Sequence, residues 1–419
     1  MSAAGEKLGA ITPEMNRRNG LIFIWTQLLI YFSAPVLYVG VVQAAFCDKL
    51  GASATVANLP SSTYLLGAVF PVICAWLFPA RLEQAVAKWA FAIVAASMLL
   101  VCVAVFFPAP NWLRIAVVIG QGLIMGIINS ITNVYTFKCL ARGTTESGRA
   151  RALKFAFGFG PVAAVLGSLS AQLLLSGKIP AIPYPYNFGI LYVVALPCMA
   201  ACAVISGRYR IVDVPDEPMT RFWTYLWQSV KAYVLDPRLI VVWIAFLLWY
   251  CTLGAMTNLS LYTREAVGRA PLELAGLIMA LRFGFKAVAG FALGAVAQRW
   301  GARIAMMVTV IFVGSAMVWP FFTTGYGYLL AFGLMGAGEL GGVYFVNYVI
   351  AISPAAHTTR NIALLSLVSP AASFVPALHG GLTDHFGFSA SFTFGATTAA
   401  LAFGLLLLFL GRSIVRGTS

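Results

Sequence analysis

Charged residues are scarce in this chain. Asp, Glu, Lys and Arg together make up 10% of its 419 residues, whereas 61% are hydrophobic, and the mean hydropathy is +0.89. Soluble globular domains carry about 25% charged residues. The composition therefore excludes a soluble fold and indicates a protein that crosses the membrane many times.

Side chains and motifs that serve catalysis are also few. The chain has only three histidines, and it contains no G-x-x-x-x-G-K-[ST], H-E-x-x-H or G-x-S-x-G sequence. The first absence argues against ATP-driven pumping, and all three argue against the enzyme classes that these motifs mark. The seven cysteines are scattered rather than spaced as metal ligands or disulfide partners. We therefore expect neither an enzyme nor a bound metal or cofactor.

Long apolar segments fill most of the chain. A spanning helix needs about 20 predominantly apolar residues, and no small-residue cleavage site follows the first segment, so we expect it to be an uncleaved helix. The fold class predicted is an all-α polytopic membrane protein with 12 transmembrane helices. The segments lie near 21–46, 55–78, 89–107, 112–137, 152–175, 186–206, 239–262, 272–297, 304–322, 326–352, 361–382 and 388–411.

The net charge of +14 reflects the positive-inside rule rather than nucleic-acid binding. With a cytoplasmic N-terminus, 20 of the 27 Lys and Arg lie in cytoplasmic segments, 5 lie outside, and two lie within a span. We therefore expect a multi-pass protein of the cell membrane with both termini in the cytoplasm. Its partners would be the bilayer and a small solute, without nucleic acid.

A weak internal repeat indicates duplication. LIFIW at 21–25 matches LIVVW at 239–243, and the same offset aligns Tyr64 with Arg282. In the fourth and tenth segments a Met-Gly pair is followed three positions later by a polar residue, namely Met125, Gly126 and Asn129 in one and Met335, Gly336 and Glu339 in the other. This order predicts two pseudo-symmetric six-helix bundles.

The domain boundaries follow from a polar stretch between the halves. We expect an N-terminal bundle at 1–207, a cytoplasmic central loop at 208–238 and a C-terminal bundle at 239–419. Apolar and aromatic residues recur at helical spacing from Phe222 to Tyr233, which favours a short amphipathic helix on the membrane surface over an irregular linker.

Twelve helices in a six-plus-six repeat with a charged central loop resemble the major facilitator superfamily over the whole chain. One motif sharpens the resemblance, because the loop after the eighth segment is similar to the family signature G-x-x-x-D-R-x-G-x-R. The resemblance implies a conformational latch between the halves, and Gln298 replaces the family's aspartate, which lowers the expected strength of that latch. The residues at the five signature positions are Gly294, Gln298, Arg299, Gly301 and Arg303.

The fifth segment contains a glycine-proline sequence, GFGPVAAVLG at 158–167. It resembles a motif that antiporters of the family carry there. Close helix packing at Gly158, Gly160 and Gly167, with a kink at Pro161, explains the same residues. Both interpretations remain open, so the sequence does not decide between symport and antiport.

Arg282 and Lys286 are the two cations within a span, and their four-residue spacing places them on one helical face. Each would cost about 3 kcal/mol at the bilayer centre, so they cannot face lipid. Glu339 is the only acidic residue well inside an apolar segment and is their obvious partner. In the family the eighth and tenth helices border a central cavity, so the resemblance implies that this trio faces it.

These charges suggest a secondary active transporter for a small organic anion with a carboxylate or phosphate group. Arg282 and Lys286 would bind the anion, and Glu339 would couple transport to a proton or a counter-solute. Four alternatives remain: a structural ion pair that binds nothing, a cavity that binds zwitterions through both signs of charge, proton-driven efflux of lipophilic or cationic compounds through Glu339, and a lipid flippase.

The first half supplies neutral polar groups for such a cavity. We expect Tyr31, Tyr38, Tyr64, Asn129 and Asn133 to line it, and hydrogen bonding between helices is the alternative role. Small residues dominate the helix contacts, which is compatible with a working monomer.

Three polar residues lie near the end of the eleventh segment or just after it. His379, Asp384 and His385 could form an external proton entry point, and an interfacial turn that tolerates polar groups is the alternative.

Overall fold

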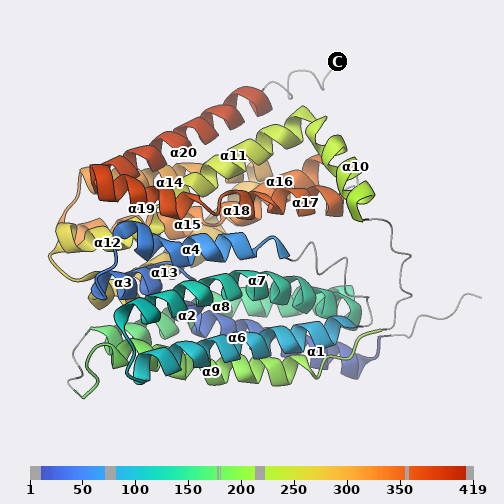
Figure 1. The fold of residues 1–419 in the computed structure, drawn as a ribbon. Helices are drawn as coiled ribbons and strands as arrows, with labels where there is room; N and C mark the ends of the chain where they lie inside the picture. The colour runs from blue at the N-terminus through green and yellow to red at the C-terminus, as the bar shows by residue number, and fades with distance from the viewer. Residues whose placement is uncertain are drawn as a thin grey trace, which may run out of the picture.

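The computed structural model describes residues 11–70, 82–176, 179, 181–212, 222–353 and 358–411, and their regular elements are all helices (Figure 1). Within this part of the chain, ten helices are long and apolar enough to cross a membrane. They match ten of the twelve expected spans, because α11 with α12, η3 with α15 and α16, and α17 to α19 each form one crossing. The all-α polytopic fold is confirmed.

The first bundle contains α1 to α9, and the second contains α11 to α20. The bounds in the first are α1 Pro13–Phe32, α2 Ala34–Leu37, α3 Val41–Lys49, α4 Ala54–Gly67, α6 Glu83–Phe106, α7 Asn111–Gly143, α8 Glu146–Leu175 and α9 Tyr186–Ser206. The connecting helix is α10 Phe222–Val234, and the second bundle holds α11 Pro237–Leu253, α12 Met256–Val267, α13 Pro271–Trp300, α14 Ala302–Val318, η2 Trp319–Phe321, η3 Gly325–Leu329, α15 Leu330–Gly338, α16 Gly341–Ile352, α17 Thr358–Ser366, α18 Val368–Ala371, α19 Val375–Phe386 and α20 Phe388–Gly411.

The first expected span is not a continuous helix. It breaks into α1, α2 and α3, with Pro35 in α2 and Gly40 at φ 145°, a conformation that favours glycine. Gln43 satisfies backbone groups freed by the break, because its amide donates to Val36 O (2.9 Å) and its Oε1 accepts from Gly40 N (3.1 Å). A broken backbone at membrane depth requires such partners. The second expected span, 55–78, begins as α4 and then enters residues outside the described part.

The tenth span is interrupted at Glu339, between α15 and α16. The carbonyl of Gly338 accepts a hydrogen bond from Trp249 Nε1 at 3.2 Å. The neighbouring Gly341 packs so closely against the Trp249 ring that a Cβ there would lie 2.6 Å from it. The indole therefore stabilises the interruption that presents Glu339.

Packing within the two bundles repeats the internal symmetry of the sequence. A Cβ at Gly126 on α7 would lie 1.9 Å from Tyr64 O on α4, and a Cβ at Gly336 on α15 would lie 2.1 Å from Arg282 O on α13. Both glycines thus permit the same close approach of two helix backbones. Tyr64 and Arg282 were aligned by the repeat, so the duplication extends to three-dimensional contacts.

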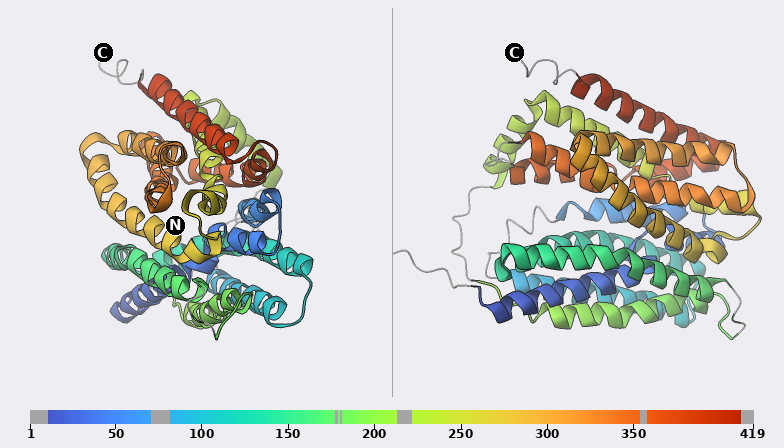
Figure 2. Two further views of the ribbon diagram at one scale, coloured as in Figure 1. Left: turned by 90° about the vertical axis from the view of Figure 1, so that its left-hand side faces the viewer. Right: turned by 180° about the vertical axis from the view of Figure 1, so that it is seen from behind.

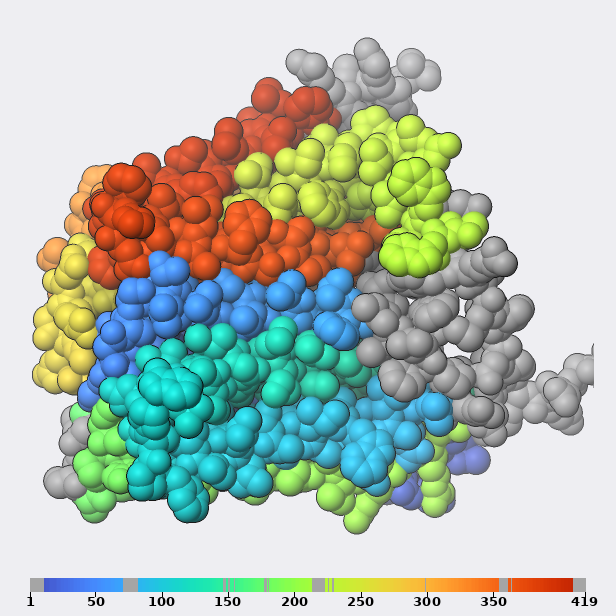
Figure 3. Space-filling model, viewed as in Figure 1, coloured from blue at the N-terminus to red at the C-terminus, as the bar shows by residue number. Residues whose placement is uncertain are grey.

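The bundles meet most extensively where α4 packs against α19 and α8 packs against α13, and α3 also contacts α12 and α13. Figure 3 shows α4 lying between α19 and α7, and Figure 2 shows the two bundles side by side from two further directions. Polar contacts join the bundles at the end that holds α3 and α12, opposite to α10, the start of α1 and the end of α20 (Figure 1). They include Asn58 to Asn258 (2.8 Å), Gln172 to Leu277 N (2.8 Å) and Arg264 to Asp48 (2.6 Å).

Asp384 on α19 accepts three hydrogen bonds from the other bundle. Its carboxylate accepts hydrogen bonds from Ala54 N (3.0 Å), Thr55 N (2.9 Å) and Thr55 Oγ1 (2.5 Å). It thereby caps the N-terminus of α4 from the other bundle, where a negative charge is favourable. Gly380 lets the helices approach, since a Cβ there would lie 2.6 Å from Thr55 Cα.

We expect Asp384→Ala to open this end of the molecule. Loss of a helix cap costs about 0.5–2 kcal/mol, so the ratio of closed to open molecules should fall roughly two- to thirtyfold. Spin labels on Trp112 and Phe386, which are 69% and 74% exposed, would report a longer inter-bundle distance.

Asp236→Ala is the matched control, because Asp236 pairs with Arg238 beside α10 at the opposite end. An unchanged distance in Asp384→Ala, or an equal change in Asp236→Ala, would show that the Asp384 cap does not hold the bundles together.

His379 does not lie in an interfacial turn. The side chain is fully buried in α19, with Nδ1 2.8 Å from Ser391 Oγ and Nε2 2.7 Å from Cys251 O. Burial and two protein partners argue against a role as an external proton entry point, and Asp384 acts as a cap. His385 lies at the end of the same helix.

The central segment contains the short helix that its pattern predicts, α10 at Phe222–Val234. Trp223 and Trp227 are 76% and 71% exposed, whereas Tyr233 is buried against the bundle. The helix contacts α11 and α17, so it belongs with the second bundle. Part of the expected loop, residues 213–221, lies outside the described residues.

Candidate functional site between the bundles

The three membrane-buried charges form one cluster. Glu339 Oε1 accepts a short hydrogen bond from Arg282 Nε, and Glu339 Oε2 lies 3.1 Å from Lys286 Nζ. The exposed fractions of the side chains are 11% for Arg282, 21% for Lys286 and 6% for Glu339. Both carboxylate oxygens are therefore engaged by a cation.

Local structure explains this geometry. Arg282 and Lys286 lie one turn apart on α13, a continuous helix, so both project from one face. Glu339 follows the last residue of α15, at the interruption that Trp249 stabilises. The close approach at Gly336 brings α15 against α13. A carboxylate is thereby held between two cations at mid-depth in the chain's eighth and tenth spans.

The first bundle supplies the aromatic wall of this site. The Tyr38 ring lies 5.6 Å from Arg282 Cζ and 5.8 Å from Lys286 Nζ, measured to the ring centroid. Tyr38 sits at the break between α2 and α3, so its position depends on the kinked first span. Aromatic rings favour cations at such distances. The cluster therefore lies where the two bundles meet.

Phe283 extends this wall and was missed by the sequence analysis. It packs edge-on against Tyr38 at 5.0 Å and against Tyr31 at 6.4 Å between centroids. Arg282 and Lys286 lie 5.8 and 5.9 Å from its centroid. The only sequence feature that pointed to Phe283 was its position next to Arg282. Many other apolar helices of this chain also contain aromatic residues, so the feature was not specific.

Tyr64 and Asn129 form the counterpart of the ion pair in the other bundle. Asn129 Nδ2 donates to Tyr64 OH at 2.7 Å. The repeat aligns this pair with Glu339 and Arg282, so a neutral hydrogen bond occupies in one bundle the place of a salt bridge in the other. Asn129 thus has the interhelical contact that was the alternative to a direct binding role.

Asn133 is not brought into the cluster. It lies on α7 one turn beyond Asn129, toward the end that holds α10, and its residue is exposed. Tyr31, by contrast, neighbours Tyr38 and Lys286. The structure therefore gathers Tyr31, Tyr38 and Tyr64 near the charges, and the binding role of Asn133 stays a prediction.

The expected latch residues lie at the end of α13 and the start of α14. Gly301 separates the helices with φ 85°, and the Arg299 guanidinium lies 5.2 Å from the Trp300 ring centroid. Arg303 Nε is buried without a hydrogen-bond partner among the described residues. A Cβ at Gly294 would meet no neighbouring atom within 4 Å. The side chain of Gln298 lies outside the described part, and the latch role stays a prediction.

The glycine-proline sequence in α8 packs closely against the first span. A Cβ at Gly160 would lie 2.5 Å from the Tyr31 ring, and one at Gly167 would lie 1.9 Å from Phe32 O. Gly158 has no such neighbour within 4 Å. Packing therefore accounts for two of the three glycines, and Gly160 helps to place Tyr31 beside the charged cluster.

Solved structures of membrane transporters share this fold. A POT family transporter, PepTSo, superposes with a TM-score of 0.70 at 12% identity, covering 96% of this chain and 99% of that chain. A D-xylose-proton symporter gives 0.68 at 14% identity, covering 94% and 97%. A mutant of the nucleoside transporter NupG gives 0.68 at 12% identity, covering 95% and 99%.

No protein-family model and no curated protein sequence matches the chain. At 12–14% identity the structural similarity establishes the fold. The chain therefore shares the fold of these transporters, which is the all-α polytopic fold that the sequence analysis predicted.

Proposed function

We propose that this protein is a secondary active transporter that moves a small organic anion by alternating access. The fold it shares with solved nucleoside, xylose and peptide transporters supports transport as the activity. The observation that supports an anion is the cluster of Arg282, Lys286 and Glu339 at the junction of the bundles.

The charge of the cluster favours an anionic solute. Two cations and one carboxylate leave one positive charge when all three are ionised, and the neighbouring side chains from the first bundle are tyrosines. An unpaired charge in a site screened from water attracts a counter-ion strongly. A carboxylate or phosphate on the solute would complete the pairing, and the aromatic rings would contact its apolar part.

Glu339 would act as the coupling residue. An anion that binds Arg282 and Lys286 must compete with the Glu339 carboxylate for the same donors. Once displaced, this carboxylate would be left buried without a partner, a state that favours uptake of a proton. Binding of the anion and a proton would thus be linked, which is what coupled transport requires.

Alternating access would involve the contacts at the end that holds α3 and α12. With both termini in the cytoplasm, as the distribution of Lys and Arg indicates, this end faces outward. The Asp384 cap and the Asn58–Asn258 hydrogen bond would then close the outer gate and must break for the site to reach that side. A single chain contains both bundles, so we propose a working monomer in the cell membrane.

A thermal-shift screen tests the proposed ligand class. We expect at least one compound in a panel of carboxylates and sugar phosphates to stabilise the purified protein, by about 2.7 kcal/mol when its concentration is one hundred times its Kd. Lys286→Ala should reduce this stabilisation by about half or more. Stabilisation only by cationic compounds, or by anions equally in Lys286→Ala, would contradict the proposal.

A further inference from the structure

A basic groove opens at the end of the molecule that holds α10, between α1 and α9. Its volume is about 720 Å³, and its polar wall carries Arg17, Arg18 and Arg208. Glu14 is the carboxylate that lines it. The groove lies at the start of the first span and the end of the sixth, whereas the charged cluster neighbours Tyr31, near the other end of α1.

The rest of the groove is apolar and continues onto the lipid-facing surface. Leu21 and Trp25 line it from α1 and are 47% and 58% exposed, and Ile205 lines it from α9. Trp25 lies seven residues beyond Arg18, which is about 10 Å along a helix. Arginine at the membrane boundary with tryptophan just below it matches the polar and apolar layers of a lipid.

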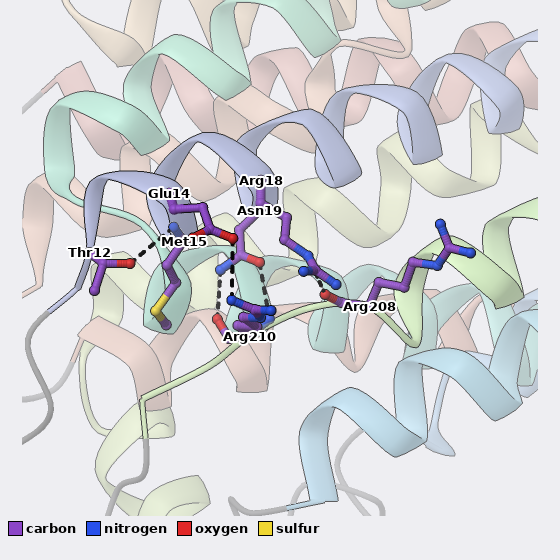
Figure 4. Close-up of polar contacts among 7 residues, drawn as sticks. All are labelled: Thr12, Glu14, Met15, Arg18, Asn19, Arg208 and Arg210. Atoms are coloured by element: carbon purple, nitrogen blue, oxygen red, sulfur yellow. Dashed lines mark hydrogen bonds and ion pairs between the residues drawn. The ribbon is translucent and has the colours of Figure 1, made fainter.

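The arginines are held by a fixed backbone. Asn19 is fully buried, and its amide donates to Gly143 O (2.8 Å) and Arg210 O (2.6 Å), while its Oδ1 accepts from Arg210 N (3.1 Å). Arg18 Nε donates to Arg208 O at 3.1 Å. Figure 4 shows the bonds of Arg18 and Asn19 to Arg208 and Arg210, which join α1 to the segment that follows α9. The site is therefore formed before any ligand binds.

Charge in the groove is unbalanced. Glu14 Oε1 lies 3.4 Å from Arg210 Nη1, so a basic residue next to the groove already pairs with it. The Arg208 side chain extends away from Glu14 (Figure 4), and the side chains of Arg17 and Arg208 have no hydrogen-bond or ion-pair partner among the described residues. The free guanidiniums favour an anionic group with several acceptor oxygens.

We propose that this groove binds the phosphate headgroup of an anionic phospholipid in the leaflet around the α10 end. Arg17, Arg18 and Arg208 contact the phosphate, and an acyl chain lies along Leu21 and Trp25. Basic pockets between helices at the cytoplasmic boundary bind anionic headgroups in this way. The bound lipid would join α1 to α9. The proposal does not depend on the identity of the transported solute.

Calorimetric titration of the purified protein with short-chain phosphatidylglycerol and phosphatidylcholine tests the proposal. We expect phosphatidylglycerol to bind at least tenfold more tightly. In Arg17→Ala/Arg208→Ala the affinity should fall roughly ten- to thirtyfold, because each basic residue near the surface contributes about fivefold. Inorganic phosphate at the same concentration should not compete with the lipid. Trp25→Ala should weaken the binding of the lipid but not that of inorganic phosphate, because Trp25 contacts the acyl chain.

Arg151→Ala/Lys231→Ala is the matched control, because it removes two exposed basic residues at the same end outside the groove. Equal affinity for the two lipids would overturn the proposal, as would an equal loss in the control variant. Effective competition by inorganic phosphate would assign the groove to free phosphate and overturn the lipid assignment. Size-exclusion profiles establish that each variant is folded.

Discussion

Glu339→Ala should strongly destabilise the protein. The Glu339 side chain is 6% exposed and pairs with Arg282 and Lys286, so its removal leaves two like charges one turn apart without a partner. Breaking a buried ion pair by removing one member costs about 3–5 kcal/mol. We expect a large fall in the apparent melting temperature of the purified protein.

A second substitution separates unpaired charge from lost packing. Glu339→Ala/Lys286→Ala removes one of the two repelling cations, so it should recover part of the stability that Glu339→Ala loses. Lys286→Ala alone leaves Arg282 paired with Glu339 and should be tolerated. The loss of stability in the double variant is compared with the sum of the losses in the two single variants. If the two were equal, the charges of Glu339 and Lys286 would not be coupled.

Arg282→Ala and Lys286→Ala should each reduce transport of an organic anion severely. A hydrogen bond to a charged group contributes about 1.5–3 kcal/mol, so we expect roughly ten- to hundredfold weaker solute binding. Counterflow in proteoliposomes, with the anion identified by thermal shift, measures the effect. Arg282→Lys should not restore activity, because lysine lacks the planar fork that binds a carboxylate bidentately.

Lys231→Ala is a suitable control, since Lys231 is an exposed residue on α10. Full transport by folded Arg282→Ala and Lys286→Ala would eliminate the anion site and leave a structural ion cluster. Efflux of a cationic dye that Glu339→Gln abolishes and Lys286→Ala leaves intact would instead support a proton-driven exporter. We expect neither of these two results, because both carboxylate oxygens of Glu339 are occupied by cations.

Hydropathy determined the number and position of most helices. The insertion of a helix into lipid depends on about 20 successive residues, and that information is local. The internal repeat likewise predicted the equivalence of Tyr64 with Arg282, which the packing at Gly126 and Gly336 repeats. The charge excess on one side of the membrane predicts orientation by the same local logic.

Breaks within the spans were not visible in the apolar pattern. The first span bends through Gly40, and the tenth is interrupted at Glu339. The interruption at Glu339 depends on a distant partner, because Trp249 binds the carbonyl of Gly338, whereas the break in the first span depends on the amide of Gln43 a few residues away. A window of hydropathy carries no information about such partners.

The sequence by itself determined that Arg282, Lys286 and Glu339 are too costly to face lipid, and therefore that they belong together in the protein interior. Only the tertiary structure decided which of the expected neighbours touch them: Tyr38 borders the cations together with Phe283, which the sequence did not single out. It also showed that Asp384 caps α4 rather than lying in a polar turn. The physical reason is that insertion energy depends on each helix alone, whereas these contacts arise between helices far apart in the chain and depend on how the two bundles pack.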